Sequence, residues 1–218
     1  MKEDVLEQIV DDFLQHRGFL TTHNIKFRPN ERRRDFVKQK DSVHSDLDVV
    51  GLDPHRRGNQ RVVAVSCKAW QSGFNAETKL MEVERLAGGN VRKPTFLHFR
   101  ELCVPKWTDA FRTVVRERTG SETFTYAIAV TRLTGRIKDP AIAAEMWAAS
   151  PVIRKALRGC RFTFLTLEDM WSDLLASSTT AVAPSEVGRL AQLLLSARLA
   201  VPPVDHTARH WSAGAVVT

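Results

Sequence analysis

The sequence of 218 residues is poor in the features that identify zinc-binding, membrane-spanning or secreted proteins. The three cysteines stand far apart and form neither a CxxC pair nor a Cys/His spacing suited to zinc, so they predict no structural zinc site. No apolar run approaches the roughly 20 residues that span a bilayer. The opening segment, MKEDVLEQIVDDF, is acidic and amphipathic, unlike a signal peptide. We expect a soluble cytoplasmic protein that binds no membrane.

Positive charge is what the chain has in surplus. It carries 32 Lys and Arg against 25 Asp and Glu, a formal net charge of +7. A surplus of this sign favours polyanionic partners, because phosphate contacts release counterions. Hydrophobic residues make up 43% of the sequence, which is enough for a packed core. The composition is therefore compatible with a globular protein that binds nucleic acid.

The hydrophobic periodicity alternates between helical and extended segments. It predicts helices over 3–17, 77–87, 106–118, 139–157 and 186–199, with a break at Pro151 and a further helix capped by Thr166 and Asp169. It predicts strands over 21–28, 46–52, 61–67, 123–131 and 161–166. Residues 90–104 fit neither pattern. This order predicts an α/β fold, a central mixed sheet of four to five strands with helices on both faces.

One domain accounts for most of the chain. The periodic pattern fills residues 1–199, and residues 200–218 show no period. We therefore expect a single domain over 1–199, followed by a loosely ordered C-terminal tail.

Two neighbouring predicted strands carry residues suited to phosphodiester hydrolysis. Asp48 lies on the first strand, and Lys68 ends the second, with Ser66 two residues before it on the same face. The turn-rich segment DPHRRGNQ predicts a hairpin, which would bring the three residues to one point. A carboxylate there can hold Mg²⁺ or Mn²⁺, and a lysine can act on the attacking water or the phosphate charge. Alternatively, Asp48 is a cap and Lys68 a sheet-edge residue, although Lys68 follows the apolar run VVAVSC, where a charge needs a partner.

The segment SDLDVVGLD…RVVAVSCKAW resembles the core of the PD-(D/E)xK nucleases, the superfamily of restriction endonucleases and Holliday-junction resolvases. Their core runs helix, three strands, helix, strand, which matches the predicted order over about residues 1–170. By this resemblance Asp48 corresponds to the metal-binding aspartate and Lys68 to the motif lysine. The resemblance implies a restriction-endonuclease-like fold, DNA as substrate, Mg²⁺ or Mn²⁺ as cofactor, and a homodimer that cuts both strands.

The chain departs from the family's motif at its second acid. Ser66 gives SxK in place of ExK, and a hydroxyl is a poor substitute for a carboxylate at Mg²⁺. Some restriction enzymes with SxK take a glutamate from the next helix. By this resemblance Glu82 or Glu84 is the preferred second metal ligand, Glu77 is a third choice, and these stay as alternatives.

Further residues extend this hypothesis. Glu7 borders the apolar face of the first helix, as does a glutamate that leans into the site in many members of the superfamily, or it is simply a solvated helix acid. Gln71 resembles the polar residue that follows the lysine motif in resolvase-like members. The consecutive Arg32, Arg33 and Arg34 form either a solvated loop or a segment that contacts phosphates.

Two functional hypotheses follow. The first is a metal-dependent DNA endonuclease acting in restriction, repair or defence, alone or with a protein partner. The second keeps the fold without catalysis, a nuclease-like protein that binds DNA or a protein partner. RNA as substrate has less support, because the sequence lacks an RNP-like aromatic motif.

Overall fold

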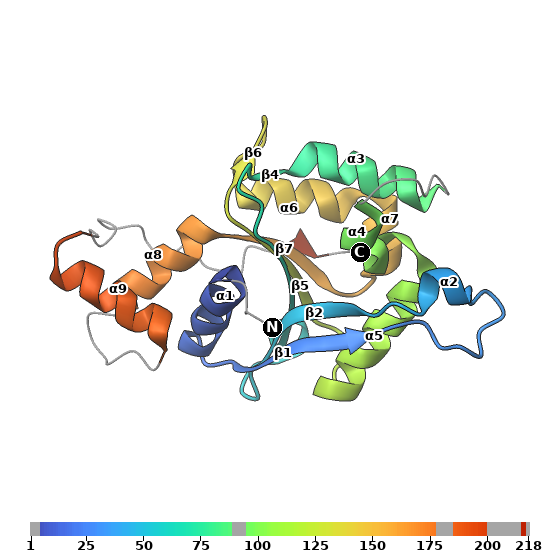
Figure 1. The fold of residues 1–218 in the computed structure, drawn as a ribbon, viewed down its shortest axis with the longest axis horizontal. Coiled ribbons are helices and arrows are strands. Elements are labelled where there is room, and N and C mark those ends of the chain that lie inside the picture. Colours follow the sequence, from blue (N-terminus) through green and yellow to red (C-terminus); the bar gives the residue numbers. More distant parts are fainter. Residues whose placement is uncertain (1–4, 89–94, 178–184, 200–214, 217–218) are drawn as a thin grey trace.

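The computed structural model describes residues 5–88, 95–177, 185–199 and 215–216. Its main feature is a mixed sheet in the order β1-β2-β3-β5-β7, extended by short β8 beyond β7 (Figure 1). The strands are β1 (Leu20–Phe27), β2 (Ser45–Leu52), β3 (Val62–Lys68), β5 (Thr125–Val130), β7 (Arg161–Thr166) and β8 (Ala215–Val216). The predicted α/β class and mixed sheet are confirmed.

The strand directions divide the sheet into two parts. β1, β2 and β3 form an antiparallel meander, and β5 and β7 continue the sheet parallel to β3. Antiparallel β2 and β3 bring the beginning of β2 beside the end of β3, and parallel β5 ends there too. Side chains from three strands can therefore meet at this end of the sheet.

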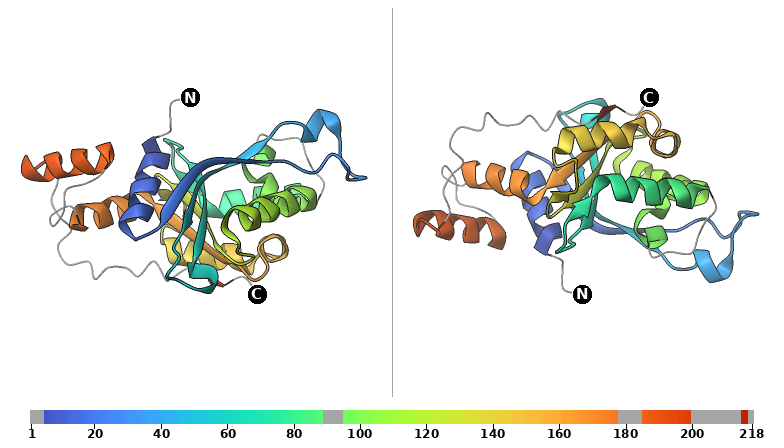
Figure 2. Two further views of the ribbon diagram at one scale, coloured as in Figure 1. Left: turned by 90° about the horizontal axis from the view of Figure 1, so that it is seen from below. Right: turned by 90° about the horizontal axis from the view of Figure 1, so that it is seen from above.

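The larger hydrophobic cluster lies between one face of the sheet and a layer of five helices (Figure 2). These helices are α3 (Ala76–Ala87), α4 (Thr95–Cys103), α5 (Pro105–Thr119), α6 (Pro140–Ala149) and α7 (Pro151–Ala156). Trp107 and Trp147 are fully buried in it, and the Trp147 ring stacks on Phe162 of β7 with centroids 5.3 Å apart. Both tryptophans thus fill the core.

A smaller cluster covers the opposite face. Helix α1 (Val5–His16) packs there with α8 (Leu167–Ser177), against Val63 and Val65 of β3 and Ala127 of β5. Helix α9 (Glu186–Ser196) contacts α1 and α8 (Figure 1). The expectation of helices on both faces is confirmed.

Local signals set the helix boundaries closely. Asp139 caps α6 by accepting hydrogen bonds from the N–H groups of Ala141 and Ile142. The predicted break falls between α6 and α7, which begins at Pro151. The N–H of Asp169 donates to Thr166 Oγ1 at 3.2 Å, as the predicted cap of α8 requires. Residues 95–103, which lacked a clear pattern, form α4.

The remaining elements are short. They are α2 (Lys38–Asp41), a 3₁₀ turn at Gly58–Gln60, and the two-residue strands β4 (Phe74–Asn75) and β6 (Leu133–Thr134), which pair with each other. Of the predicted C-terminal tail, residues 200–214 and 217–218 lie outside the described residues, and Ala215–Val216 pairs with β7. In the described part of the chain, the helices are too short or too polar to cross a membrane.

Candidate active site

The regular pairing of β2 is interrupted at Asp48. Pairing with β1 is present at Leu47 and Val49, but the described register has no bridge between Asp48 and Asn24. Asn24 has a left-handed backbone with φ of 52°, which asparagine adopts more readily than most residues. The pairing with β3 also ends at Val49. Asp48 Oδ2 accepts a hydrogen bond from the N–H of Cys67 at 2.5 Å, which holds the carboxylate beside the end of β3.

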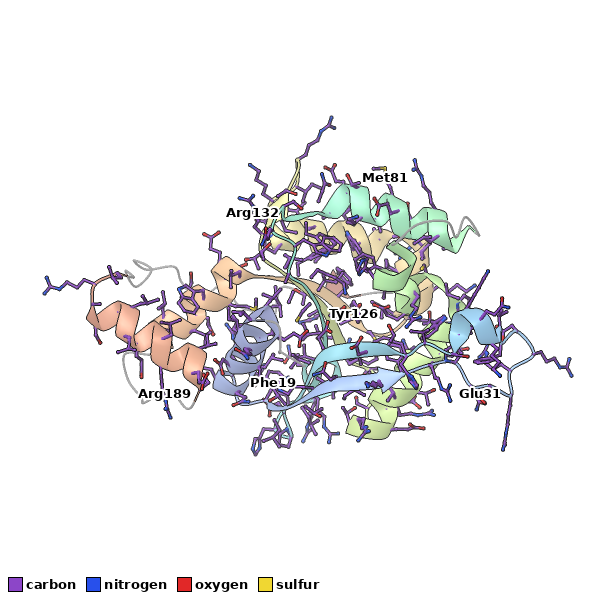
Figure 3. The ribbon with its side chains drawn as sticks, viewed as in Figure 1. Phe19, Glu31, Met81, Tyr126, Arg132 and Arg189 are labelled. Atoms are coloured by element: carbon purple, nitrogen blue, oxygen red, sulfur yellow. The ribbon has the colours of Figure 1, made fainter. Side chains whose placement is uncertain are left out.

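Lys68 and Ser66 lie on the same face of β3, the face that carries the larger cluster. Lys68 Nζ donates to Ser66 Oγ at 2.7 Å. The side chain of Ser66 also interacts with the phenol of Tyr126 on the neighbouring strand β5, which lowers the pKa of that phenol. Figure 3 labels Tyr126 near the centre of the molecule, between the sheet and the helices. The motif serine thus connects Lys68 to a buried tyrosine.

The chain of hydrogen bonds ends at a carboxylate that the sequence analysis did not identify, that of Glu101 on α4. Tyr126 Oη donates to Glu101 Oε1 at 2.7 Å. Glu101 is only 4% exposed, and its backbone carbonyl accepts a hydrogen bond from Thr108 Oγ1 of α5 at 2.8 Å. Helix α4 is kinked at Phe99, two residues earlier, where φ is −141°. This kink and the contact with α5 set how Glu101 faces the sheet.

Burial dominates the electrostatics of this cluster. Desolvation by burial raises the pKa of Glu101, and the negative charge of Asp48 raises it further. The positive charge of Lys68 and the hydrogen bond from Tyr126 lower this pKa, but the net shift is upward. Burial, together with the nearby Glu101, raises the pKa of Tyr126 well above its ordinary value. The phenol therefore keeps the proton that it donates to Glu101. The site combines two carboxylates, a lysine and two hydroxyls.

An aromatic and basic rim borders these residues. The Trp70 ring, two residues after Lys68, lies edge-on to His98 with centroids 5.6 Å apart. Lys79 Nζ lies 5.0 Å from the centroid of the Trp70 ring. Partial burial and the positive charges of Lys68 and Lys79 lower the pKa of His98, which favours the neutral imidazole.

The acids proposed for the second ligand lie in other surroundings. Glu82 Oε2 pairs with Lys79 Nζ at 2.9 Å, and Glu84 Oε1 accepts a hydrogen bond from Ser150 Oγ at 2.7 Å. Glu7 lies on α1, which packs on the face of the sheet opposite Lys68. The acid that contacts the Lys68–Ser66–Tyr126 chain is instead Glu101. Its place in the largely apolar segment TFLHFRELCV, where a buried carboxylate needs a partner, was a signal in the sequence that could have identified it.

The arginine run borders a groove of about 860 Å³ at the same end of the sheet as Asp48. We call it the basic groove, and its positively charged lining is Lys26, Arg28, Arg32, Arg33 and Lys106, accompanied by His44 and by the acids Glu31, Asp109 and Glu117. Arg33 is fixed by Asp35 and by Asp109 of α5, whereas the side chains of Arg32 and Arg34 are exposed. Gln71 is exposed in the turn after Trp70.

The donor chemistry of the cluster fits a hard divalent cation. Mg²⁺ takes oxygen ligands and is usually held by one or two carboxylates together with water and substrate phosphates. Asp48 and Glu101 supply two such carboxylates, Asp48 held by the N–H of Cys67 and Glu101 by the phenol of Tyr126. Among the described residues there is no cluster of three or more His, Cys, Asp or Glu side chains suited to a metal ion.

Comparison of the chain with protein-family models, with curated proteins and with solved structures gives no match.

Proposed function

We propose that the protein is a Mg²⁺- or Mn²⁺-dependent endonuclease that hydrolyses phosphodiester bonds in DNA. The observation that supports this most directly is the meeting of Asp48, Lys68 and Glu101 where β2 and β3 separate. The resemblance of the segment SDLDVVGLD…RVVAVSCKAW to the PD-(D/E)xK core also supports the proposal.

In this proposal each residue has a distinct task. Asp48 and Glu101 would hold the cation, which supplies charge neutralisation at the scissile phosphate and a more acidic bound water. Lys68 would orient the attacking water or offset the negative charge that grows on the phosphate. Ser66 would hold the Lys68 ammonium group through its 2.7 Å hydrogen bond. Tyr126 would act as a positioning residue for Glu101.

The basic groove offers a path for the DNA backbone. Lys26 of β1 pairs with Asp46, two residues before Asp48, so the groove begins close to the proposed reaction centre. Exposed Arg32 and Arg34 lie on the segment between β1 and α2, which projects from the body of the molecule; Glu31 marks it in Figure 3. Side chains placed in this way contact phosphates and position the duplex without reading its sequence.

Supercoiled plasmid DNA and MgCl₂ provide the first test of this function. Asp48→Ala and Lys68→Ala should each abolish cleavage while leaving DNA binding largely intact, because neither residue lies in the basic groove. Glu145→Ala, which removes an exposed acid on α6, serves as the matched control and should cut like the unmodified protein. Undiminished cleavage by Asp48→Ala or Lys68→Ala would refute the proposal.

A catalytically inactive, DNA-binding protein is the second candidate. Two observations favour it: Ser66 stands in place of the motif acid, and Glu101 already accepts a hydrogen bond from Tyr126. Isothermal titration calorimetry with MgCl₂ and MnCl₂ separates the two candidates. Salt-dependent DNA binding without a divalent-cation site would favour the inactive protein.

A further inference from the structure

A second concave site lies at the other end of the sheet. It is a cavity of about 400 Å³ between the β2–β3 turn and the segment before β5, lined by Arg56, Arg57, Gly58, Arg61, Ser121 and Thr123, among others. Lys68 ends the seven-residue strand β3, and Arg61 directly precedes its first residue. At about 3.3 Å per residue, the cavity is roughly 20 Å from the proposed reaction centre. It therefore cannot be part of the same site.

The charge lining this cavity is of one sign. Three of its described lining residues are arginines and none is acidic. Arg56 is held in place by an ion pair with Asp53 at 2.7 Å and by a hydrogen bond to the carbonyl of Arg17 at 3.1 Å. Arg57 is exposed. Because Asp53 offsets Arg56, the excess positive charge belongs to Arg57 and Arg61.

Arg61 shows an unmet hydrogen-bonding need. Its Nε is buried and has no hydrogen-bond partner in the described part of the chain. A buried donor without an acceptor is costly, and an anion in the cavity would remove that cost. Glu122 lies between Ser121 and Thr123 in the sequence, and its carboxylate is 3.6 Å from the guanidinium of Arg116 of α5. This acid therefore leaves Arg57 and Arg61 available to a ligand.

We propose that this cavity binds a phosphate group, with Arg57 and Arg61 as its charged ligands. Guanidinium groups match the planar pairs of oxygens that a phosphate presents, and they keep their charge at all physiological pH values. The hydroxyl of Thr123 can donate to a further oxygen, whereas the Ser121 hydroxyl already donates to the carbonyl of Thr123 at 2.7 Å. The volume admits a phosphate monoester such as a mononucleotide, or one phosphate of a nucleic-acid chain.

Binding measurements on the full chain test this site without reference to cleavage. Titration with inorganic phosphate should shift the Arg61 Nε–Hε resonance in a ¹⁵N-correlated NMR spectrum. Arg57→Gln and Arg61→Gln should each weaken phosphate binding at least tenfold. Arg136→Gln, which removes an exposed arginine far along the chain, should change it less than twofold.

Parallel titrations identify the source of the phosphate. If 5′-adenosine monophosphate binds and adenosine does not, a small phosphate monoester is the ligand. If only a short oligonucleotide binds, and Arg57→Gln weakens it, the ligand is a backbone phosphate. Absence of any Arg61 shift with all these probes, or equal binding by Arg57→Gln and Arg136→Gln, would overturn the proposal. Since Arg57 is exposed, Arg57→Gln keeps the test valid even if Arg61→Gln fails to fold.

Discussion

The phenol of Tyr126 donates a 2.7 Å hydrogen bond to the carboxylate of Glu101, and both side chains are buried. Because the side chain of Ser66 also interacts with this phenol, the tyrosine connects the motif segment of β3 to helix α4. A carboxylate held in this way has a defined orientation before any ligand arrives. That is the property a preorganised metal ligand requires.

Tyr126→Phe removes this hydrogen bond and keeps the ring. We expect the Mg²⁺-dependent cleavage rate to fall by about 10- to 100-fold, the usual cost of losing a partner of a metal ligand. We also expect Mg²⁺ affinity, measured by calorimetry, to fall by a similar factor. Ile128→Val, on the same face of β5, is the control and should leave both quantities unchanged, at a cost of about 1 kcal/mol in stability. Equal Mg²⁺ affinity in Tyr126→Phe and the unmodified protein would argue against a positioning role.

Glu101→Gln distinguishes the observed acid from those expected on α3. The amide keeps the size of the side chain and can still accept from Tyr126, but it is a weaker ligand for Mg²⁺. Cleavage should fall at least 100-fold in Glu101→Gln and by less than threefold in Glu82→Gln and Glu84→Gln, all measured at saturating MgCl₂. The reverse ranking would return the second ligand to α3.

The exposed arginines near the basic groove should determine the salt dependence of DNA binding. Each phosphate contact contributes about 0.9 to the slope of log K against log salt, so losing two contacts should reduce it by about 1.8. Arg32→Gln/Arg34→Gln should show this reduction in fluorescence anisotropy with duplex DNA. The charge-matched Arg136→Gln/Arg154→Gln, on exposed positions elsewhere, should retain the original slope.

The packing of α9 on α1 should depend on pH through Asp12. This residue is 8% exposed, and its Oδ2 accepts a hydrogen bond from Ser185 Oγ, the N-cap of α9, at 2.5 Å. Burial, opposed by the Ser185 bond and assisted by neighbouring Asp11, raises the pKa of Asp12 above 3.8. The folded state therefore binds this proton more tightly. Its stabilising effect is complete below pH 3.8 and is lost as the pH rises through the folded pKa.

Asp12→Asn stays neutral and keeps an oxygen for Ser185. Relative to the unmodified protein, its free energy of unfolding should increase as the pH rises through that window and then level off, as urea titrations at several pH values would measure. Glu145→Gln, an exposed acid on α6, should give no such rise. A pH-independent difference for Asp12→Asn would contradict the assignment.

Asp41 should anchor the projecting segment. Lys106 Nζ donates to its Oδ2 at 2.6 Å, and Trp107 Nε1 donates to its Oδ1 at 3.2 Å. Asp41→Ala leaves the Trp107 Nε1–H without its acceptor and removes the carboxylate that pairs with Lys106, which keeps only its 2.8 Å hydrogen bond to the carbonyl of Asp35. We therefore expect a loss of about 3 kcal/mol in urea denaturation. A loss below about 1 kcal/mol would show that the segment is held by other contacts. Exposed Asp109, which pairs with Arg33 at the surface, provides the control, with Asp109→Ala costing under about 1 kcal/mol.

The local parts of the fold could be predicted, because their signals are local. The cap at Asp139, the break at Pro151 and the hairpin between β2 and β3 each follow from a few adjacent residues. The geometry around Asp48 was harder to predict from the sequence. Strict alternation treats β2 as regular, whereas the left-handed Asn24 on the neighbouring strand interrupts the pairing at Asp48.

The second acid could not be found by spacing. The resemblance to SxK nucleases points to α3, the first helix after the motif. The segment that forms α4 has no clear hydrophobic period, because this helix is kinked at Phe99. Glu101 reaches the site only through packing of α4 against α5 and hydrogen bonding to Tyr126, contacts that join distant parts of the chain. Such contacts leave little trace in one sequence.

The parallel pairing of β3 with β5 has a kinetic consequence. Val63 pairs with Thr125, so the chain between them, which contains α3, α4 and α5, is a long loop that this pairing must close. Closing such long loops has an entropic cost that precedes any gain from the contact, which slows folding. Lys68 lies on β3 and Tyr126 lies on β5, so they come together only when these two strands pair. The proposed activity should therefore recover last during refolding, after most of the helical circular-dichroism signal.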